Sequence, residues 1–302
     1  MKFILQYPQA NGLERDMLDA GDVGEMAAAA ERAGFDGFSL TEHPIPGARW
    51  LAHGGHQSVD PFVALAFAAA ATKRLRLLTY LAVVPYRNPF LLAKASATLD
   101  RMSNGRFVLG VGSGYHKTEF HALGVDFEER NALFDEALDV LPLAWSGEAF
   151  SFKGRHFEAR NVIQLPRPTQ QPIPIWIGGN SRLARRRVAR AAQAWMPMGG
   201  TEELAKTTRT AHIGSLDVLR DMIAEVKDMA RERAGALDFV GQYPDPDLST
   251  SPTRDVARHR DAFARQARAG ITWIVVGASH AAPERHRAFI EEFGATYIAA
   301  GG

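Results

Sequence analysis

Apolar segments of strand length alternate with amphipathic segments of helix length along almost all of this 302-residue chain. Eight segments have the composition of buried strands, and they span residues 3–7, 35–41, 75–84, 107–111, 175–177, 195–198, 239–243 and 271–276. Segments with helical spacing follow them, at residues 23–33, 61–72, 90–102, 131–145, 183–192, 216–233, 253–269 and 283–293. Such alternation predicts a parallel sheet, and eight units predict a closed (β/α)₈ TIM barrel. An open doubly wound sheet is the alternative, but it would need fewer strands and a glycine motif after the first one.

One segment departs from this alternation. Residues 150–157 alternate apolar and polar side chains around Gly154, which predicts a small hairpin after the fourth helix. A proline-rich connector at residues 166–174 ends the hairpin. Because α/β barrels commonly reach this length as one unit, residues 1–302 are expected to form a single domain.

The composition excludes several classes of function. Lys and Arg number 35 against 34 Asp and Glu, so nothing in the charge balance indicates a nucleic-acid or membrane partner, and a small-molecule substrate is expected. The absence of cysteine excludes disulfides and thiolate metal sites. Met1 and Lys2 lead directly into the first expected strand, with no segment typical of a signal peptide, so a cytoplasmic location is expected.

Three polar or glycine-rich clusters follow expected strands, and in a TIM barrel the ends of the strands meet at the face where chemistry occurs. The first cluster is Glu42 and His43. The imidazole of His43 is suited to general acid or base catalysis near neutral pH, although a loop histidine that bonds the backbone is the plainer interpretation. Glu42 either orients His43 or simply ends the strand.

The other two clusters contain glycine and are candidates for binding a flat or anionic group. Gly110, Gly112 and Gly114 do not have the spacing of the dinucleotide-binding motif, so a close approach of backbone to ligand, or a plain turn, is expected there. Residues 178–181 open a helix, whose free N–H groups suit a phosphate. Arg182 lies beside this start, whereas a solvated helix face is expected for the arginines that follow, Arg185, Arg186, Arg187 and Arg190.

Two histidines close in sequence, His53 and His56, could suggest a metal site, but the residues around them do not favour one. The glycines between them fix no ligand geometry, and no cluster of Asp or Glu follows a strand nearby, so no metal is expected. Trp50, a few residues earlier, is expected to cover a pocket or to pack plainly against its neighbours.

Four segments together resemble the luciferase-like family of flavin- and deazaflavin-dependent oxidoreductases, which are (β/α)₈ barrels. They are residues 35–43, 85–89, 99–114 and 175–179, in the family's order and spread over most of the chain. The resemblance implies that a deazaflavin (coenzyme F420) or FMN lies in the barrel mouth, with its phosphate at the loop after strand five and beside the glycine segment after strand four. The cofactor-binding residues it implies are Gly112, Ser113, Gly114, Tyr115, Gly178, Gly179, Asn180, Ser181 and Arg182.

Further expectations come from the same resemblance. Deazaflavin members hold a non-proline cis peptide in strand three, expected here between Leu78 and Leu81 and first of all at Thr79–Tyr80, which places Thr79 and Tyr80 behind the cofactor ring. His43 matches a histidine that serves in proton transfer. The sugar-phosphate enzymes of the family carry a glutamate where this chain has Tyr115, which argues against a sugar-phosphate substrate. The resemblance and an apolar surface at residues 90–99 predict a homodimer.

The leading hypothesis is therefore an oxidoreductase that transfers a hydride between coenzyme F420 and a small organic substrate, with His43 exchanging the proton. An FMN-dependent monooxygenase of the same family is the alternative. From other classes, a flavin-binding barrel without turnover and a metal-dependent barrel hydrolase stay open.

Overall fold

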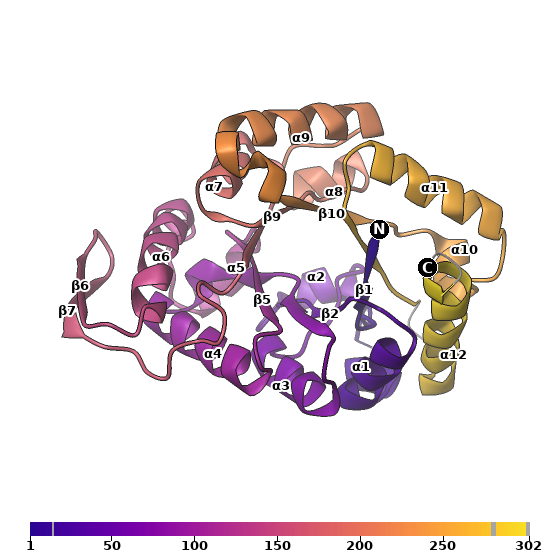
Figure 1. The fold of residues 1–302 in the computed structure, drawn as a ribbon, viewed down its shortest axis with the longest axis horizontal. Coiled ribbons are helices and arrows are strands. Elements are labelled where there is room, and N and C mark those ends of the chain that lie inside the picture. The colour runs from indigo at the N-terminus through magenta and orange to yellow at the C-terminus, as the bar shows by residue number, and fades with distance from the viewer. Residues whose placement is uncertain (14, 279–281, 300–302) are drawn as a thin grey trace.

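Eight parallel strands close into a barrel in the computed structural model, which describes residues 1–13, 15–278 and 282–299. The strands are β1 (Lys2–Gln6), β2 (Gly37–Leu40), β3 (Arg76–Thr79), β5 (Phe107–Gly112), β8 (Ile175–Gly178), β9 (Ala194–Met196), β10 (Asp238–Gln242) and β11 (Trp273–Val276). Each pairs in parallel with its neighbours, and pairing between β3 and β5 completes the ring (Figure 1). The predicted (β/α)₈ barrel is confirmed.

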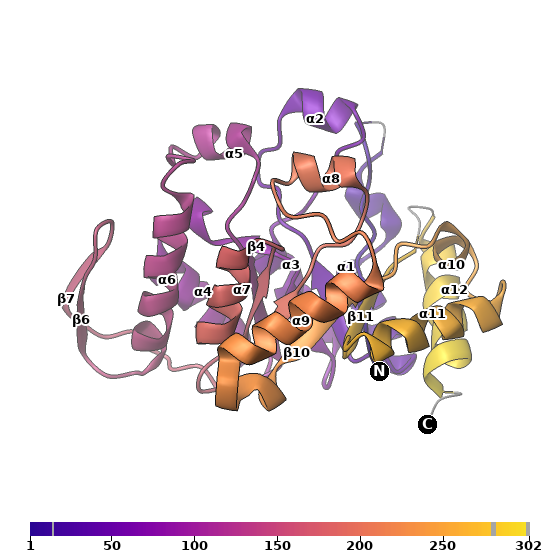
Figure 2. The same ribbon diagram turned by 90° about the horizontal axis from the view of Figure 1, so that it is seen from above.

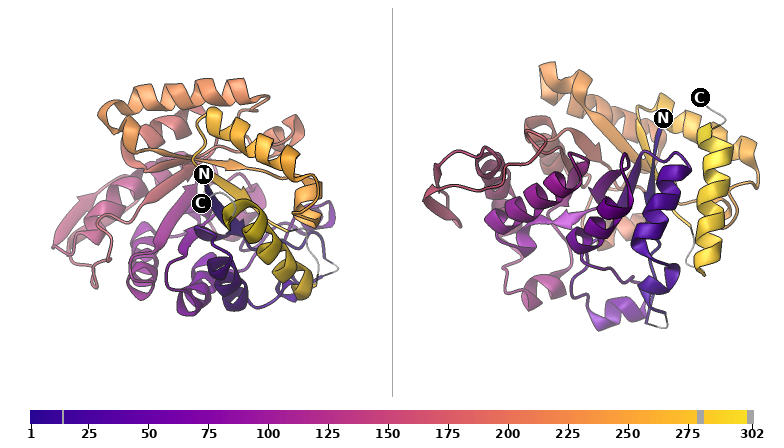
Figure 3. Two further views of the ribbon diagram at one scale, coloured as in Figure 1. Left: turned by 45° about the vertical axis from the view of Figure 1, so that its right-hand side comes forward. Right: turned by 60° about the horizontal axis from the view of Figure 1, so that its bottom comes forward.

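Long helices surround the strands (Figure 3). They are α1 (Val23–Arg32), α3 (Pro61–Ala71), α4 (Pro89–Met102), α6 (Arg130–Trp145), α7 (Arg182–Ala191), α9 (Leu216–Ala230), α11 (Val256–Arg268) and α12 (Pro283–Phe293). Several begin where the sequence supplies a cap, because the side chains of Asp22, Asp60, Asn88, Ser181 and Ser215 accept hydrogen bonds from backbone N–H groups of the first turn.

The predicted hairpin follows α6. It consists of β6 (Phe150–Lys153) and β7 (Glu158–Val162), which pair antiparallel and lie apart from the barrel strands (Figure 2). The carboxylate of Glu136 on α6 accepts hydrogen bonds from the backbone N–H groups of Arg155, His156 and Phe157, so the turn of the hairpin is fixed to that helix.

Strand three differs from the expected continuous run at residues 75–84. It is interrupted after β3 and resumes as β4 (Ala82–Val83), which also pairs with β5. The peptide between Tyr80 and Leu81 is cis, which lies within the expected range of Leu78 to Leu81 but one bond later than the favoured Thr79–Tyr80. An apolar run shows that a segment is buried, but it does not show where the segment leaves the sheet.

Two segments for which the sequence predicts neither a strand nor a helix contain short helices. Residues 116–130 include α5 (Lys117–Ala122), and residues 199–214 include α8 (Glu202–Thr207). With six residues each, these helices are too short to display apolar periodicity, although Thr201 caps α8 through a bond from the N–H of Leu204. Together with α2 (Ala48–Ala52), they lie on the same side of the barrel in Figure 2.

The remaining short elements are η1 (Met17–Ala20), η2 (Val84–Tyr86), η3 (Arg231–Ala236), α10 (Pro246–Thr250) and η4 (Gly294–Ile298). The barrel interior is filled by one buried cluster: Ile4, Leu78, Val108, Trp176, Ala194, Met196, Val240, Trp273 and Val275. A larger core lies between strands and helices. Among the described residues, no helix combines the length and the apolar character needed to cross a bilayer.

Candidate active site

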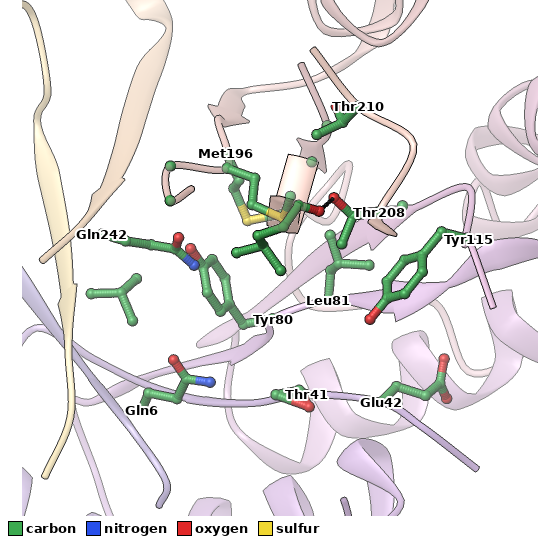
Figure 4. A pocket seen from close by; sticks show the side chains of 18 of the residues that line it. Gln6, Thr41, Glu42, Tyr80, Leu81, Tyr115, Met196, Thr208, Thr210 and Gln242 are labelled. Carbon is green, nitrogen blue, oxygen red and sulfur yellow. Dashed lines mark hydrogen bonds between the residues drawn. The ribbon is translucent and has the colours of Figure 1, made fainter. Parts of the chain in front are cut away.

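A cavity of about 1270 Å³ opens at the carboxyl ends of the barrel strands. Figure 4 shows side chains that line it, from β1 (Gln6), the end of β2 (Thr41, Glu42), the β3–β4 segment (Tyr80, Leu81), the loop after β5 (Tyr115), β9 (Met196) and β10 (Gln242). This is the face at which TIM barrels carry out chemistry, and the volume suits a ligand of cofactor size.

His43 lies in the cavity wall three residues beyond the end of β2 and is 9% exposed. Its Nδ1 lies 3.2 Å from Oε2 of Glu119, and its Nε2 lies 3.5 Å from the hydroxyl of Tyr115. Its backbone is held as well, because the N–H donates to Oγ of Ser58 and the Ser58 hydroxyl donates to the carbonyl. Both the imidazole ring and the backbone of His43 are therefore held by hydrogen bonds.

Glu119 on α5 is the acidic partner of His43, and the sequence did not reveal it. Its side chain is fully buried, and Oε2 also accepts a hydrogen bond from the hydroxyl of Tyr86 at 2.7 Å. Burial alone would raise the pKa of Glu119, but the bonds from His43 and Tyr86 outweigh it and hold the pKa below its usual value. Glu119 is thus a carboxylate at neutral pH. The local signal was a set of apolar residues in this segment, such as Phe120, Leu123 and Phe127, which indicates that it packs against the barrel.

Glu42 does not take the role of orienting His43. Its carboxylate accepts hydrogen bonds from the backbone N–H of Val83 and from the guanidinium of Arg87. Burial raises the pKa of Glu42, and the bonds from Arg87 and Val83 oppose that rise. Although Glu42 lines the cavity, its bonds join the end of β2 to β4 and the segment after it. The expected His43–Glu42 pair is replaced by His43–Glu119.

Uncharged rings surround His43. Ring centroids of Trp50, His56, Tyr115 and His116 lie between 4.7 and 6.0 Å from that of His43. Burial lowers the pKa of His56 to about 4 and also lowers the pKa of His116, so both are neutral at pH 7. Burial and the charge of Glu119 raise the pKa of Tyr115 to about 12. Glu119 is therefore the formal charge closest to the imidazole.

The glycines that end β5 and β8 make room for Leu81. A Cβ on Gly112 would lie 2.6 Å from Cδ1 of Leu81, and one on Gly178 would lie 2.4 Å from its Cδ2. A Cβ on Gly110 would lie only 1.9 Å from the carbonyl oxygen of Thr79. A ligand was expected to approach the backbone closely at these glycines. In the structure, the space beside them is taken by Thr79 and Leu81 of the chain itself.

The two residues expected behind the cofactor ring have different positions. Thr79 is fully buried, donates to the carbonyl of Gly110 at 2.7 Å, and does not line the cavity. Tyr80 does line it and lies beside Gln242 (Figure 4). Burial raises the pKa of Tyr80, and a hydrogen bond with Gln242 opposes that rise.

Gly179 and Ser181 reach the cavity as expected, together with Gly112, Ser113, Gly114, Tyr115 and Gly178. Asn180 does not, because it is fully buried and its side chain bonds the backbone of Met198 and Ala211. Arg182 is 77% exposed and pairs with Glu225 on α9, away from the cavity lining. The binding roles expected for the side chains of Asn180 and Arg182 are therefore not supported.

The expected solvated face of α7 is wrong for two of its arginines. Arg185 and Arg187 are buried, and Arg185 bonds Glu225 and the carbonyl of Asn180. Arg187 lines the cavity, but its guanidinium is paired with Asp135 and bonded to Asn131. Both hold α7 to neighbouring helices.

Trp50 lies at the cavity edge without lining it, with its ring 4.7 Å from that of His43. His53 and His56 do not converge on a common point with acidic residues. Within residues 1–13, 15–278 and 282–299, no group of three or more His, Asp or Glu side chains is arranged to hold a metal ion.

The sequence of residues 1–213 matches the family model described as luciferase-like monooxygenase. The chain belongs to this family. An uncharacterized protein of Mycobacterium tuberculosis is 31% identical over 222 residues, which cover 70% of this chain and 71% of that protein. An F420-dependent glucose-6-phosphate dehydrogenase of Tsukamurella paurometabola is 29% identical over 246 residues, which cover 76% and 67%.

Solved structures of other proteins share the fold. Monooxygenase RslO1 from Streptomyces bottropensis aligns over 100% of both chains with a TM-score of 0.76 and 20% identity. An F420-dependent secondary alcohol dehydrogenase, solved with an F420–acetone adduct, aligns over 99% of this chain and 98% of its own with a TM-score of 0.75 and 19% identity. The proteins that this chain resembles thus include F420-dependent dehydrogenases and a monooxygenase.

The cavity has the chemistry that a deazaflavin or flavin requires. Tyr80, Leu81 and Met196 provide an apolar bed, and Gln6 and Gln242 offer amide groups beside it. The hydroxyl of Thr41 is buried in the cavity wall and bonds no residue that the structure describes. Such an unpartnered group in a cavity wall is a site for a ligand's hydrogen bond. These residues fit a polar, flat cofactor.

Proposed function

We propose that this protein is an F420-dependent oxidoreductase that interconverts a small uncharged alcohol and its carbonyl compound, with His43 as the residue that exchanges the substrate proton. The observation that carries the proposal is that His43, in the wall of a cofactor-sized cavity, is held by the carboxylate of the buried Glu119. Coenzyme F420, when bound, supplies the acceptor or donor of the hydride. The residues that would hold it are Tyr80, Leu81, Met196, Gly179 and Ser181.

The hydrogen bonds of His43 determine which nitrogen is active. A carboxylate only accepts, so Nδ1 carries the proton that faces Glu119, and Nε2 keeps its lone pair. In alcohol oxidation Nε2 takes the hydroxyl proton, and the carboxylate of Glu119 stabilises the imidazolium that results. In the reverse direction the imidazolium returns a proton to the oxygen. Tyr115, with its hydroxyl 3.5 Å from Nε2, positions the oxygen that reacts.

The surroundings of His43 favour an uncharged substrate. Neutral rings flank the imidazole, and the nearest charge is the carboxylate of Glu119. An anionic group next to His43 would meet that negative charge without a cation to offset it. This supports an alcohol or a ketone over a sugar phosphate, in agreement with Tyr115 in place of the glutamate of the sugar-phosphate enzymes.

The alternative is an FMN-dependent monooxygenase, and the family description favours it. The two functions make different demands, because a monooxygenase consumes oxygen and the dehydrogenase works without it. Titration of the protein with F420 and with FMN, followed by tryptophan fluorescence, tests the choice. We expect micromolar F420 binding, at least tenfold tighter than FMN, and anaerobic reduction of F420 by secondary alcohols. Tenfold tighter binding of FMN, or turnover that requires oxygen, would contradict the proposal.

A further inference from the structure

The floor of the cavity consists of side chains that follow the apolar interior of the barrel along its strands. Ile4 on β1 and Val240 on β10 belong to the buried cluster that fills the interior. Because strand side chains alternate between two faces, the residues two positions later, Gln6 and Gln242, also point into the barrel. Both line the cavity (Figure 4). Two carboxamide groups therefore lie where the apolar filling of the barrel ends.

A buried hydroxyl lies on the strand next to Gln6. In the pairing of β1 with β2, Gln6 is opposite Ser39, and Thr41 follows two positions later on the same face. Thr41 is 8% exposed and lines the cavity, and its hydroxyl bonds no residue that the structure describes. The partly buried carboxamide of Gln6 likewise forms no hydrogen bond within residues 1–13, 15–278 and 282–299. Polar groups left unpaired in a cavity wall cost free energy that a ligand's polar atoms recover.

Gln6 and Thr41 lie on the side of the cavity that faces the expected cofactor bed. Leu81 packs against the ends of β5 and β8, and in the closed ring of barrel strands β1 and β11 lie across from these two. A flat ring that rests on Leu81 therefore presents its free face to the end of β1. The substrate has to lie against that face, and His43 follows β2, the neighbour of β1. Gln6 and Thr41 are thus placed to contact the substrate.

The polar groups on this side of the cavity are almost all uncharged. Gln9 and Asn11, in the loop after β1, add two carboxamides to the lining. Among the described lining residues that belong to β1, β10, β11 and the loops behind them, Arg15 is the one with a charge, and it is exposed. Carboxamides both donate and accept hydrogen bonds, so they match hydroxyl and carbonyl groups. An alcohol with a single hydroxyl would bond His43 and leave Gln6 unpaired.

We propose that Gln6 and Thr41 recognise the substrate, and that this substrate is an uncharged compound with at least one hydroxyl or carbonyl group besides the one that reacts. A diol or a hydroxyketone is of this class. The inference rests on the proposed function, in which His43 exchanges the proton of the reacting group, and it narrows the substrate from alcohols in general to those with further oxygens. Gln242, whose carboxamide bonds the hydroxyl of Tyr80, keeps further hydrogen-bonding capacity at the same floor.

Substrates that share one carbon skeleton test this recognition. Cyclohexanol is compared with the positional isomers of cyclohexanediol as reductants of F420, in the wild type, Gln6→Leu, Thr41→Val and the double variant. Leu and Val preserve the approximate shape of the replaced side chains and remove their polar groups. Gln164→Leu, beyond β7 and outside the cavity lining, is the matched control. We expect the wild type to use at least one diol about tenfold better than cyclohexanol in kcat/KM, each replacement to remove most of this preference, and the control to retain it.

Equilibrium binding separates the substrate from the cofactor. Oxidised F420 does not react with a ketone, so calorimetry can compare cyclohexanone with hydroxycyclohexanone on the loaded protein. Hydroxycyclohexanone should bind about tenfold more tightly than cyclohexanone to the wild type and to Gln164→Leu, and Gln6→Leu and Thr41→Val should lose most of this difference. The affinity for F420, followed by tryptophan fluorescence, should stay within about twofold in every variant.

A wild type that does not distinguish the diols from cyclohexanol would overturn the inference, and so would variants that keep the preference. Weaker F420 binding in Gln6→Leu or Thr41→Val would assign these groups to the cofactor and overturn it as well. If no alcohol reduces F420, the proposed function fails. The two ketones, measured with whichever of F420 and FMN binds, then still test the recognition by Gln6 and Thr41.

Discussion

His43 and Glu119 are 76 positions apart in the chain, yet they form the contact on which the proposed chemistry depends. The end of β2 leads to His43 in the cavity wall, and the short helix α5 holds the buried Glu119 that bonds it. Glu119 acts through His43, so it is a positioning residue, and Tyr86 in turn holds Glu119. Because these residues have different roles, replacing each one should change a different kinetic quantity.

Replacing Glu119 by Gln preserves the shape of the side chain and removes its charge. We expect kcat to fall about 10- to 100-fold with little change in KM or in cofactor affinity, because the imidazolium loses its counter-charge. Glu119→Asp should recover part of the loss, and Tyr86→Phe should have a smaller effect. Steady-state kinetics and cofactor titration measure both quantities. An unchanged kcat in Glu119→Gln would remove this residue from the mechanism.

The partly buried His56 predicts a dependence of stability on pH. Its pKa is about 4 in the folded protein and about 6.5 in an unfolded chain, so between these values the unfolded chain binds a proton that the folded chain does not. The free energy of unfolding therefore falls as the pH drops, by about 2 kcal/mol between pH 7.5 and pH 5. Urea unfolding at the two pH values should show that His56→Gln loses less stability than the wild type. An equal loss in both proteins would contradict this assignment.

Sequence reasoning at this scale found residues at strand ends and missed residues on short helices. His43 was predictable, because it follows an apolar strand and barrels place chemistry there. The partner was predicted as Glu42, the neighbour in sequence, but the Arg87 guanidinium takes that carboxylate. Glu119 depends on how residues 116–130 fold back over the mouth, and a polar segment of that length carries no periodicity to predict it.

At the scale of elements, the β3–β4 segment explains why the ends of β5 and β8 are glycines. Leu81 lies between β5 and β8, with one terminal methyl against Gly112 and the other against Gly178. The glycine-rich ends of these strands, the most distinctive feature of the sequence, follow from this packing. The sequence shows the glycines but not the side chain that requires them.

This packing predicts a rescue between two positions. Gly178→Ala should lower the free energy of unfolding by about 1–3 kcal/mol, because the new methyl group would overlap Cδ2 of Leu81. Leu81 has little room to move away, since its Cδ1 packs against Gly112. In a Leu81→Ala background the same change should have little effect, since the remaining neighbours lie at 3.6 Å or beyond. Gly199→Ala, with no atom within 4 Å, is the control for urea unfolding. Additive effects of Gly178→Ala and Leu81→Ala would disprove the contact.

At the scale of the whole molecule, the closed barrel was predictable because eight alternations leave few other arrangements. The expected apolar surface at residues 90–99 is different in the structure. Most of the apolar side chains of that segment, such as Leu92 and Leu99, pack inward. Exposed apolar residues lie on the neighbouring α3, where Val63 is 61% and Phe67 is 63% exposed, as well as on α4, where Leu91 is 67% exposed.

A helix that is apolar on all sides normally has its outer face covered as well. We therefore expect α3 and Leu91 to pack against a second copy of the chain in a homodimer. Sedimentation velocity at micromolar concentration should give a dimer for the wild type and a monomer for Phe67→Glu. Val218→Glu, on α9, should stay dimeric. A wild-type protein that sediments only as a monomer would refute this expectation.

The most direct test of the central claim is an anaerobic single turnover of F420 with a secondary alcohol, followed by the loss of F420 absorbance, in the wild type and in His43→Ala. Because His43 moves the substrate proton and does not hold the cofactor, the variant should bind F420 with nearly unchanged affinity and react about 10²- to 10⁴-fold more slowly. If His43→Ala reduces F420 as fast as the wild type, His43 is not the proton-transfer residue, and the proposed mechanism is wrong.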